Sequence, residues 1–569
     1  MILKGKGIAP GVAVGQIYVY DEKFDIPCES LVPSGEEQAH LDRYYSVKKE
    51  ALDEIERIKS TVGSVDPIKA EIFTAHKEIV EDIIINEEIP ARILNEHWTG
   101  DWAIYQVYET VLGVLRKNSD SLIAERAADF DDIRAMLLRL WYGQKSSSLS
   151  SLKEPCVIAT RELKPSGTAG FNSGKILAIL TETGGVTSHA AIIAKSYGIP
   201  AVLGIEGLLS TVKQGQRAAV DAAEGTVIID PEEEIEKEYQ EKSGVFSRDR
   251  KDAETFQKRE ALTLCGTKID IGLNISNADD EELSAQGYTD GVGLFRTEFL
   301  FMERNTLPSQ EEQFLIYKKV LESFGERPVI LRVLDIGGDK QIPYIEQKHE
   351  DNSFLGNRGI RLCFSNLEIF KTQLRAALRA SIYGNLWLML PMVGSIDDIK
   401  KAKRIIAKIK GELKKENIRF GDVKIGIMIE IPGIALIAGL AAREVDFASI
   451  GSNDLCQYLC AADRMNAAVE PYYQSYHPAM FRLIKETVSA FNNAKKPISI
   501  CGELGSDPFA IPALLGLGLR KFSMGAASVA VAKRAIAAVT VAQAEEMAKK
   551  VLSFSTASEI ENFLCPNNE

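Results

Sequence analysis

The sequence predicts an α/β protein of several domains, in which a small α/β domain with an inserted helical bundle precedes a (β/α)8 barrel. Three observations indicate this architecture. The chain has 569 residues, too many for a single hydrophobic core. Between residues 34 and 142, apolar residues recur at three- and four-residue spacing with few Gly or Pro, which is typical of helices. After residue 260, eight apolar β-type segments alternate with helical sequence, the count of a closed barrel.

The amino-terminal half divides into three parts. Residues 1–33 and 143–230 contain short β-type runs separated by glycines, such as CVIAT, GKILAIL and GTVIID, and are expected to form the small α/β domain. Residues 34–142 supply a bundle of about four helices as an insertion in that domain. Residues 231–260 are crowded with charge, which indicates a solvated linker helix of about 44 Å at about 1.5 Å per residue.

Residues 261–569 form the predicted barrel. Continuous apolar strands fit this fold because barrel strands are buried on both faces. The eight candidates are KIDIGLNI, GVGLFRT, PVILRVLDIGG, LWLMLPMV, VKIGIMIE, VDFASIGSN, PISICGE and KFSM.

Composition excludes several classes of protein. A formal charge of −13 argues against extensive nucleic-acid binding. No stretch approaches the roughly 20 apolar residues that span a bilayer, and the glycines and Pro10 of the first segment favour strand and turn over a signal sequence. Eight scattered cysteines indicate reduced thiols. Cys456 and Cys460 lie four residues apart but lack the further ligands of a zinc site. We expect a cytoplasmic protein without membrane insertion.

Polar side chains follow the predicted barrel strands at the ends where barrel enzymes place their chemistry. Glu430 and Asp454 are 24 residues apart, one β/α repeat, so they should lie on adjacent strands and could share Mg²⁺. Guanidinium groups pair with phosphate and carboxylate oxygens. A lone charge at a strand end is usually a surface salt bridge, but this set together predicts a site for a small phosphate-bearing anion with Mg²⁺. Its further members are Arg296, Arg332, Arg358, Asn453 and Arg464.

A cysteine, Cys501, ends the seventh predicted strand. Such a cysteine is more often a small buried hydrophobic residue. In a site that generates an enolate, however, its thiol could donate the proton.

One of the six histidines lies in GGVTSHAAIIAKSYGIP. Gly184 and Gly185 allow a tight turn, and Thr187 or Ser188 can cap a helix that begins near His189. A helix amino terminus favours a bound phosphate, and a neutral imidazole there is a suitable nucleophile toward phosphorus. The alternative is a capping or core histidine; the flanking motif favours the nucleophile.

These motifs resemble a known family. GGVTSHAAI is similar to the phosphohistidine signature of enzymes that use phosphoenolpyruvate, and RTEFLF, LDIGGDK, GSNDLCQYLCAADR and CGELGSDP are similar to their substrate-binding barrel. The whole chain resembles Enzyme I of the bacterial sugar phosphotransferase system, the phosphoenolpyruvate–protein phosphotransferases.

The resemblance implies a role for each of the candidate residues. His189 would accept the phosphoryl group of phosphoenolpyruvate and pass it to a histidine of the phosphocarrier HPr, which docks on residues 34–142. Glu430 and Asp454 would hold Mg²⁺, and Cys501 would protonate the enolate to pyruvate. The family forms homodimers through the barrel. The residues implied to contact phosphoenolpyruvate are Arg296, Arg332, Asn453 and Arg464.

The chain departs from the family pattern at four positions, which bear on rate and carrier specificity: Val186, Lys195, Gly433 and Cys456.

Two other functions stay open. A dikinase or phosphoenolpyruvate synthase would need an ATP-binding domain ahead of the histidine, but only 188 residues precede it and no P-loop is evident. A regulator that senses phosphoenolpyruvate without transfer would tolerate the loss of His189 or Cys501, yet both are present.

Overall fold

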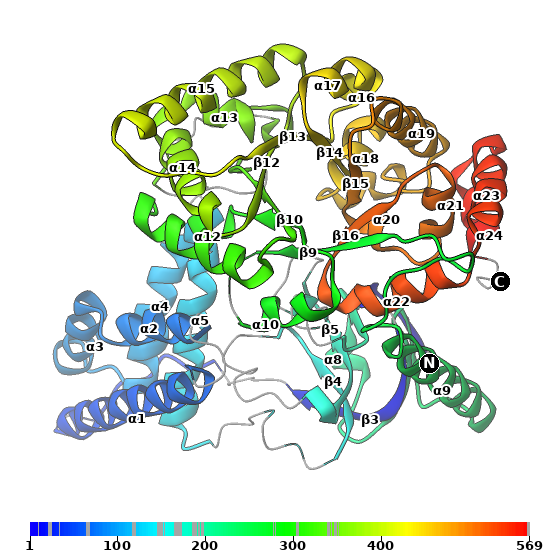
Figure 1. Ribbon diagram of the computed structural model, residues 1–569. Helices are drawn as coiled ribbons and strands as arrows, with labels where there is room; N and C mark the ends of the chain where they lie inside the picture. Colours follow the sequence, from blue (N-terminus) through cyan, green and yellow to red (C-terminus); the bar gives the residue numbers. More distant parts are fainter. Residues whose placement is uncertain are drawn as a thin grey trace. The chain divides into compact units, whose positions relative to one another are not determined.

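The computed structural model divides the chain into two compact units, Met1–Asp249 and Arg250–Glu569, whose elements are labelled in Figure 1. It describes residues 1–9, 11–20, 26–33, 35–63, 69–116, 121–144, 149, 152, 154–163, 173–184, 190–191, 194, 198–276, 278, 280–302, 306–337, 342, 344–345, 350 and 352–565.

The first unit contains an eight-stranded mixed sheet in the order β1-β8-β7-β3-β4-β5-β6-β2. Its centre is parallel, from β3 through β6, and its outer pairs are antiparallel. The amino-terminal segment therefore supplies strands to the small α/β domain, as the sequence predicts. The strands are β1 (Ile2–Lys4), β2 (Lys6–Ala9), β3 (Val12–Tyr20), β4 (Cys156–Thr160), β5 (Ile176–Thr181), β6 (Ala201–Leu203), β7 (Arg217–Asp221) and β8 (Thr226–Ile229).

Both faces of this sheet carry a hydrophobic core. Because successive side chains of a strand point to opposite faces of the sheet, Ile158 of β4 lies in one hydrophobic cluster and its neighbours Val157 and Ala159 lie in the other. The short helix α8 (Leu208–Thr211) contributes Leu208 to the second cluster.

Among the described residues between β3 and β4 there are five helices: α1 (Glu37–Gly63), α2 (Lys69–Val80), α3 (Ile83–Asn95), α4 (Gly100–Arg116) and α5 (Ser121–Trp141). They bury a common core that includes Tyr44, Ile89 and Tyr108. The sequence indicated about four helices because 71–85 reads as one apolar run. The run breaks where the Asp82 carboxylate accepts a hydrogen bond from the Ile85 backbone N–H and so caps a new helix, α3.

The charged segment after β8 forms α9 (Glu233–Glu254), which has 22 residues and is shorter than the predicted linker helix. Three acidic residues occupy its first turn, where they stabilise the positive end of the helix dipole.

The second unit is a closed barrel of eight parallel strands in the order β10-β11-β12-β13-β14-β15-β16-β9. All eight predicted runs become strands. They are β9 (Asp270–Ile275), β10 (Val292–Arg296), β11 (Pro328–Arg332), β12 (Asn385–Leu390), β13 (Lys424–Ile429), β14 (Phe447–Gly451), β15 (Ile498–Cys501) and β16 (Lys521–Met524).

Helices surround this ring of strands (Figure 1). Several begin at capping boxes, such as Ser309 with Glu312 and Ser395 with Asp398, which fix where the strand-to-helix loops end. The helices are α10 (Asp280–Leu283), α11 (Phe299–Met302), α12 (Gln310–Phe324), α13 (Ile360–Ser365), α14 (Leu367–Ala380), α15 (Ile396–Lys415), α16 (Pro432–Leu436), α17 (Ala438–Glu444), α18 (Ser452–Cys460), α19 (Pro478–Asn493), α20 (Glu503–Ser506), α21 (Ala510–Gly516), α22 (Ala526–Ala537), α23 (Val541–Ser553) and α24 (Ala557–Leu564).

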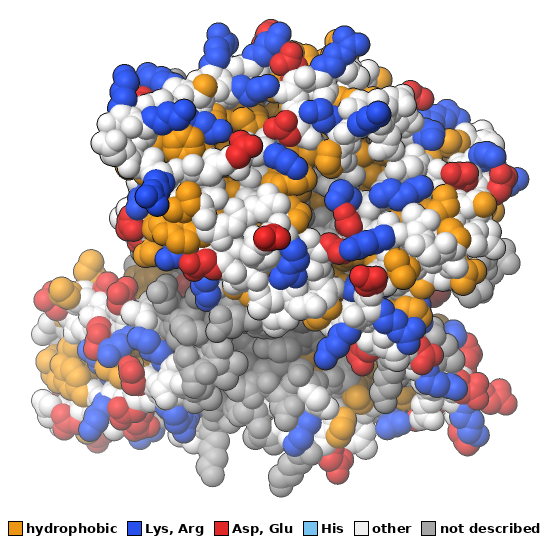
Figure 2. All heavy atoms as spheres, in the orientation of Figure 1, with side chains coloured by type: hydrophobic (Ala, Val, Ile, Leu, Met, Phe, Trp, Pro, Cys, Tyr) orange, Lys and Arg blue, Asp and Glu red, His pale blue; other side chains and the backbone are white. Residues whose placement is uncertain are grey.

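Figure 2 shows basic and acidic side chains interspersed over the visible face of the barrel unit. Within the described ranges, no single helix is long and apolar enough to cross a membrane. In this described part of the chain, only α22 and α23 taken together, bent by 100°, reach that length and composition.

Candidate active site at the barrel mouth

Two predicted arginines end neighbouring strands. Arg296 is the last residue of β10 and Arg332 the last of β11, and the two are register partners. Thr297 fixes this edge because its hydroxyl donates to the Arg332 carbonyl at 2.8 Å and accepts from the Gln373 amide at 2.9 Å. The guanidinium of Arg296 forms no hydrogen bond or ion pair with another described residue, although it lies near enough to Cys501 to influence that thiol.

Arg332, by contrast, is held on two sides by carboxylates. It is 6% exposed, donates to Glu298 Oε1, and places Nη1 at 2.9 Å from Asp335 Oδ2. Burial alone would lower its pKa, but Glu298 and Asp335 outweigh burial and raise it further. Arg332 therefore stays charged and has a fixed orientation before any ligand binds.

Arg358 continues the same network. Its Nη2 lies 3.2 Å from Asp335 Oδ2, and its Nη1 lies 3.2 Å from Asp454 Oδ1 and 3.3 Å from the Tyr458 hydroxyl. Gly337 makes this packing possible: it has φ +115°, and a Cβ there would lie 2.5 Å from the Arg358 Cβ. Asp335 thus bridges Arg332 at the end of β11 and Arg358 just before α13.

Glu430 follows β13 and is completely buried. Its Oε1 accepts a hydrogen bond from the backbone N–H of Met392, a non-glycine residue held at φ +53°. Its Oε2 has no hydrogen-bond partner among the described residues. Burial, together with Asp335 and Asp454, raises the pKa of Glu430 to about 8.

Asp454 and Asn453 lie in the first turn of α18, which begins directly after β14. Since β13 and β14 are neighbours, Glu430 and Asp454 follow adjacent strands, as their spacing predicts. Asp454 Oδ1 also lies 3.8 Å from Arg464 Nη1. The Asn453 side-chain carbonyl accepts the Glu503 backbone N–H at 2.9 Å, so among the described residues its amide nitrogen is the group left to donate.

These carboxylates fit a divalent cation. A buried carboxylate oxygen without a partner, flanked by two further acids, is a position where a positive ion removes a large electrostatic cost. No group of three or more His, Cys, Asp or Glu side chains in the described part of the chain is arranged as a complete metal site. A cation on Glu430 and Asp454 would therefore take its other ligands from water and phosphate, as Mg²⁺ commonly does.

Cys501 ends β15 inside the barrel and is 2% exposed. Its thiol accepts from the Ser449 hydroxyl at 3.6 Å and donates to the Ile450 carbonyl at 3.4 Å. Burial raises the pKa of this thiol, although Ser449 and Arg332 oppose the shift. Cys501 is therefore protonated at neutral pH.

His189, Val186 and Lys195 lie outside the described residues, so their placement stays a prediction. The helix expected after His189 is present at positions 190, 191 and 194, where three alanines are buried in the core of the small domain. Gly433 lies in α16, and no side chain crowds the position where its Cβ would be.

Sequence reasoning found the arginines but gave no role to the groups that orient them. Glu298 and Asp335 were visible only as further polar residues after strands. Met392 and Tyr458 could not be recognised from the sequence. The backbone N–H of Met392 and the hydroxyl of Tyr458 become hydrogen-bond partners of Glu430 and Arg358 only in the folded chain.

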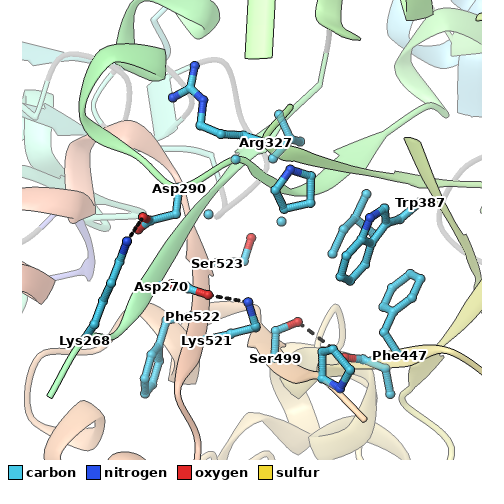
Figure 3. A pocket seen from close by; sticks show the side chains of 18 of the residues that line it. Lys268, Asp270, Asp290, Arg327, Trp387, Phe447, Ser499, Lys521, Phe522 and Ser523 are labelled. Carbon is cyan, nitrogen blue, oxygen red and sulfur yellow. Dashed lines mark hydrogen bonds and ion pairs between the residues drawn. The ribbon is translucent and has the colours of Figure 1, made fainter. Parts of the chain in front are cut away.

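A separate cavity of about 480 Å³ opens at the opposite end of the barrel, where the strands begin (Figure 3). Lys268 pairs with Asp290 at 3.4 Å on its rim, and Trp387 and Phe447 form an aromatic wall with ring centroids 4.9 Å apart. None of the candidate ligands for phosphate or metal lines this cavity. Its aromatic wall nevertheless packs in the same interior cluster as Cys501.

Comparison with known proteins identifies the class. Family models for enzymes that use phosphoenolpyruvate match three segments: the N-terminal domain at residues 4–126, the mobile domain at 152–225 and the PEP-binding domain at 250–541. The third match contains every candidate ligand at the barrel mouth. The fold and this site thus define a PEP-utilising enzyme.

Curated relatives narrow the class. The chain is 38% identical over 564 residues to the phosphoenolpyruvate-protein phosphotransferase of Bacillus subtilis (strain 168), covering 99% of both chains. It is 38% identical over 562 residues to that of Staphylococcus carnosus (strain TM300), covering 98% of this chain and 97% of the relative. The chain therefore belongs to the phosphoenolpyruvate-protein phosphotransferase family.

Proposed function

We propose that this enzyme transfers the phosphoryl group of phosphoenolpyruvate to His189 and then to a histidine of the phosphocarrier HPr, releasing pyruvate, as the first step of the sugar phosphotransferase system. The observation that carries the proposal is full-length similarity to the family, combined with an arginine and carboxylate cluster around a buried thiol.

Charge balance at the barrel mouth supports a phosphate-bearing substrate. Arg332 and Arg358 are engaged with Glu298, Asp335 and Asp454, so they orient a ligand more than they neutralise it. Arg296 has no such partner among the described residues and is the best candidate to meet the phosphoryl oxygens. Fixed guanidinium groups stabilise charge in the transition state without having to reorganise.

Magnesium fits this arrangement. Glu430 and Asp454 would hold Mg²⁺, which would supply charge neutralisation at the phosphoryl group when bound. Without such a cation, a multiply charged anion would face buried carboxylates that repel it.

Protonation of the enolate is assigned to Cys501. Once the phosphoryl group has left, the remaining enolate needs a proton at its methylene carbon. Burial keeps the Cys501 thiol protonated, and Arg332 and Arg296 lie near enough to stabilise the thiolate that remains.

The other predicted roles follow from this reaction. His189 would be the nucleophile, and it must reach the donor at the barrel and the acceptor carrier in turn, with residues 231–260 as the connecting segment. Residues 34–142 would dock HPr, residues 1–33 and 143–230 would carry the phosphohistidine, and residues 261–569 would bind phosphoenolpyruvate. We further infer a cytoplasmic homodimer that pairs through the barrel.

Pyruvate release in the presence of HPr tests the proposal. With phosphoenolpyruvate and Mg²⁺, the full chain should release pyruvate in amounts that match phosphorylated HPr, and chelation by EDTA should stop both. Pyruvate released without phosphorylated HPr would contradict transfer. A matched control is His97→Asn, since His97 is an exposed histidine at φ +56° where Asn is tolerated; it lies in the segment proposed to dock HPr, so this variant should keep the wild-type rate of His189 phosphorylation by phosphoenolpyruvate.

A further inference from the structure

Two cysteines face each other on the helix that carries the metal and substrate candidates. Cys456 and Cys460 lie one turn apart on α18, with their sulfur atoms 4.0 Å apart. Cys456 is buried at 1% exposure, whereas Cys460, the last residue of the helix, is half-buried. Neither thiol takes part in the proposed phosphoryl transfer.

The surroundings make the two thiols unequal. The contact between the two sulfur atoms, together with the backbone of Gln474, holds the pKa of Cys460 below its usual value, at about 6. Cys460 is also the more exposed of the two thiols, so it is the one that meets a peroxide first, and the Cys456 sulfur, 4.0 Å away, lies within reach to resolve the oxidation product.

We propose that Cys456 and Cys460 are an oxidation site at which a hydroperoxide converts the two thiols to a disulfide. The Cys460 thiolate attacks the peroxide oxygen, which breaks the O–O bond, releases alcohol or water after protonation, and leaves a sulfenic acid on Cys460. The Cys456 thiol then attacks that sulfur, and the S–O bond breaks with loss of water. Two thiols lose two electrons in total, and the peroxide gains them.

Formation of the bond must open the end of the helix. Side chains four residues apart on a helix have Cβ atoms about 5–6 Å apart, while a disulfide needs about 3.5–4.5 Å. Cys460 can move because α18 ends there, with Ala461 at φ +53° in the left-handed region and no further helical turn beyond it. Cys456, inside the helix and buried, is the fixed partner.

Two residues between the cysteines connect this turn to arginines of the proposed substrate site. The Gln457 side chain accepts the Arg464 backbone N–H at 3.1 Å. The Tyr458 hydroxyl donates to the Phe354 carbonyl at 2.6 Å and accepts from Arg358 at 3.3 Å. Distortion of this turn therefore displaces both arginines. This consequence rests on the proposed function, whereas the oxidation itself does not.

Peptide mapping after peroxide treatment tests the oxidation directly. Trypsin leaves both cysteines in one peptide, residues 444–464, because no Lys or Arg lies inside it. After treatment of the full chain with hydrogen peroxide and alkylation, this peptide should lose the mass of two hydrogens and take up no alkyl group, and dithiothreitol should reverse both changes.

Turnover measured on the same samples tests the consequence. Oxidation should lower pyruvate release with HPr by about tenfold or more, since displacement of positioning groups by about 1 Å is costly, and dithiothreitol should restore it. Cys460→Ser should resist the loss. Cys265→Ser is the control, because Cys265 is an exposed thiol away from α18, and this variant should still lose activity.

Several results would overturn the proposal. The site would be excluded if peptide 444–464 remained fully alkylated, if Cys460 stopped at sulfinic acid, or if Cys460 paired with another cysteine. A disulfide that forms while turnover stays unchanged would exclude the effect on the arginines. A chain that forms the disulfide but never releases pyruvate, even when reduced, would instead contradict the proposed function.

Discussion

Arg296 and Arg332 end adjacent strands of the barrel, yet removal of Arg296 should leave stability almost unchanged, whereas removal of Arg332 should lower it. In Arg296→Gln the lost guanidinium has no partner among the described residues, so the free energy of unfolding should change by less than about 0.5 kcal/mol. If Arg296 meets the phosphoryl oxygens, its loss should remove about 3–4 kcal/mol of transition-state stabilisation, or about 10²–10³ in kcat. Arg332→Gln should lower both the free energy of unfolding and kcat.

The cost at Arg332 follows from its surroundings. Its guanidinium faces Glu298 and Asp335, which are 0% and 2% exposed. Removal of one partner of a buried ion pair costs about 3–5 kcal/mol, because the remaining charge stays buried. The unfolding midpoint of the barrel should fall by several degrees.

Urea unfolding and steady-state turnover of the full-length variants separate the two effects. The expected pattern is an inactive but stable Arg296→Gln and an inactive, destabilised Arg332→Gln. If Arg296→Gln proved as unstable as Arg332→Gln, the free-guanidinium interpretation would be wrong. If it kept full turnover, Arg296 would not contact the substrate.

Three further predictions concern other parts of the barrel. Cys501→Ala should slow pyruvate formation by about 10²–10⁴, the usual contribution of an acid catalyst, while His189 is still phosphorylated at the wild-type rate; unchanged turnover would assign the proton to another group. Iodoacetamide at pH 7 should label Cys265 before Cys501. Hydrogen bonds from Thr263 and other neighbours lower the pKa of Cys265 to about 6, whereas burial raises the pKa of Cys501. Cys501 should react only at a pH above the ordinary thiol pKa of about 8.5, and label on Cys501 at pH 7 would contradict its burial. Lys533→Met should lower the free energy of unfolding by about 2–4 kcal/mol with turnover retained, because the buried ammonium donates to the carbonyls of Gln257, Arg259 and Tyr288 at 2.6–2.8 Å; an unchanged urea midpoint would refute this.

The strands of the barrel could be predicted from sequence because each is a continuous apolar run between helical stretches. The neighbouring positions of Glu430 and Asp454 could be predicted for the same reason, since one β/α repeat separates adjacent strands. The break between α2 and α3 could not, because a single aspartate at position 82 caps a helix inside an apolar pattern that continues through it.

The orientation of the side chains in the candidate site could not be predicted from the sequence either. Asp335 contacts Arg332 at the end of β11 and Arg358 just before α13, and nothing in the linear order brings these two arginines to one carboxylate. The sulfur pair on α18 shows the same limit: a spacing of four residues is visible in the sequence, but the 4.0 Å separation depends on the rotamers in the fold.

The most direct test of the proposed reaction is the site of the transferred phosphoryl group. The chain is mixed with radiolabelled phosphoenolpyruvate and Mg²⁺, quenched, digested and mapped. Acid-labile, base-stable label should appear on the peptide that contains His189, should pass to HPr when it is added, and should be absent from His189→Ala. Label on another peptide, or label that persists in His189→Ala, would contradict the proposal.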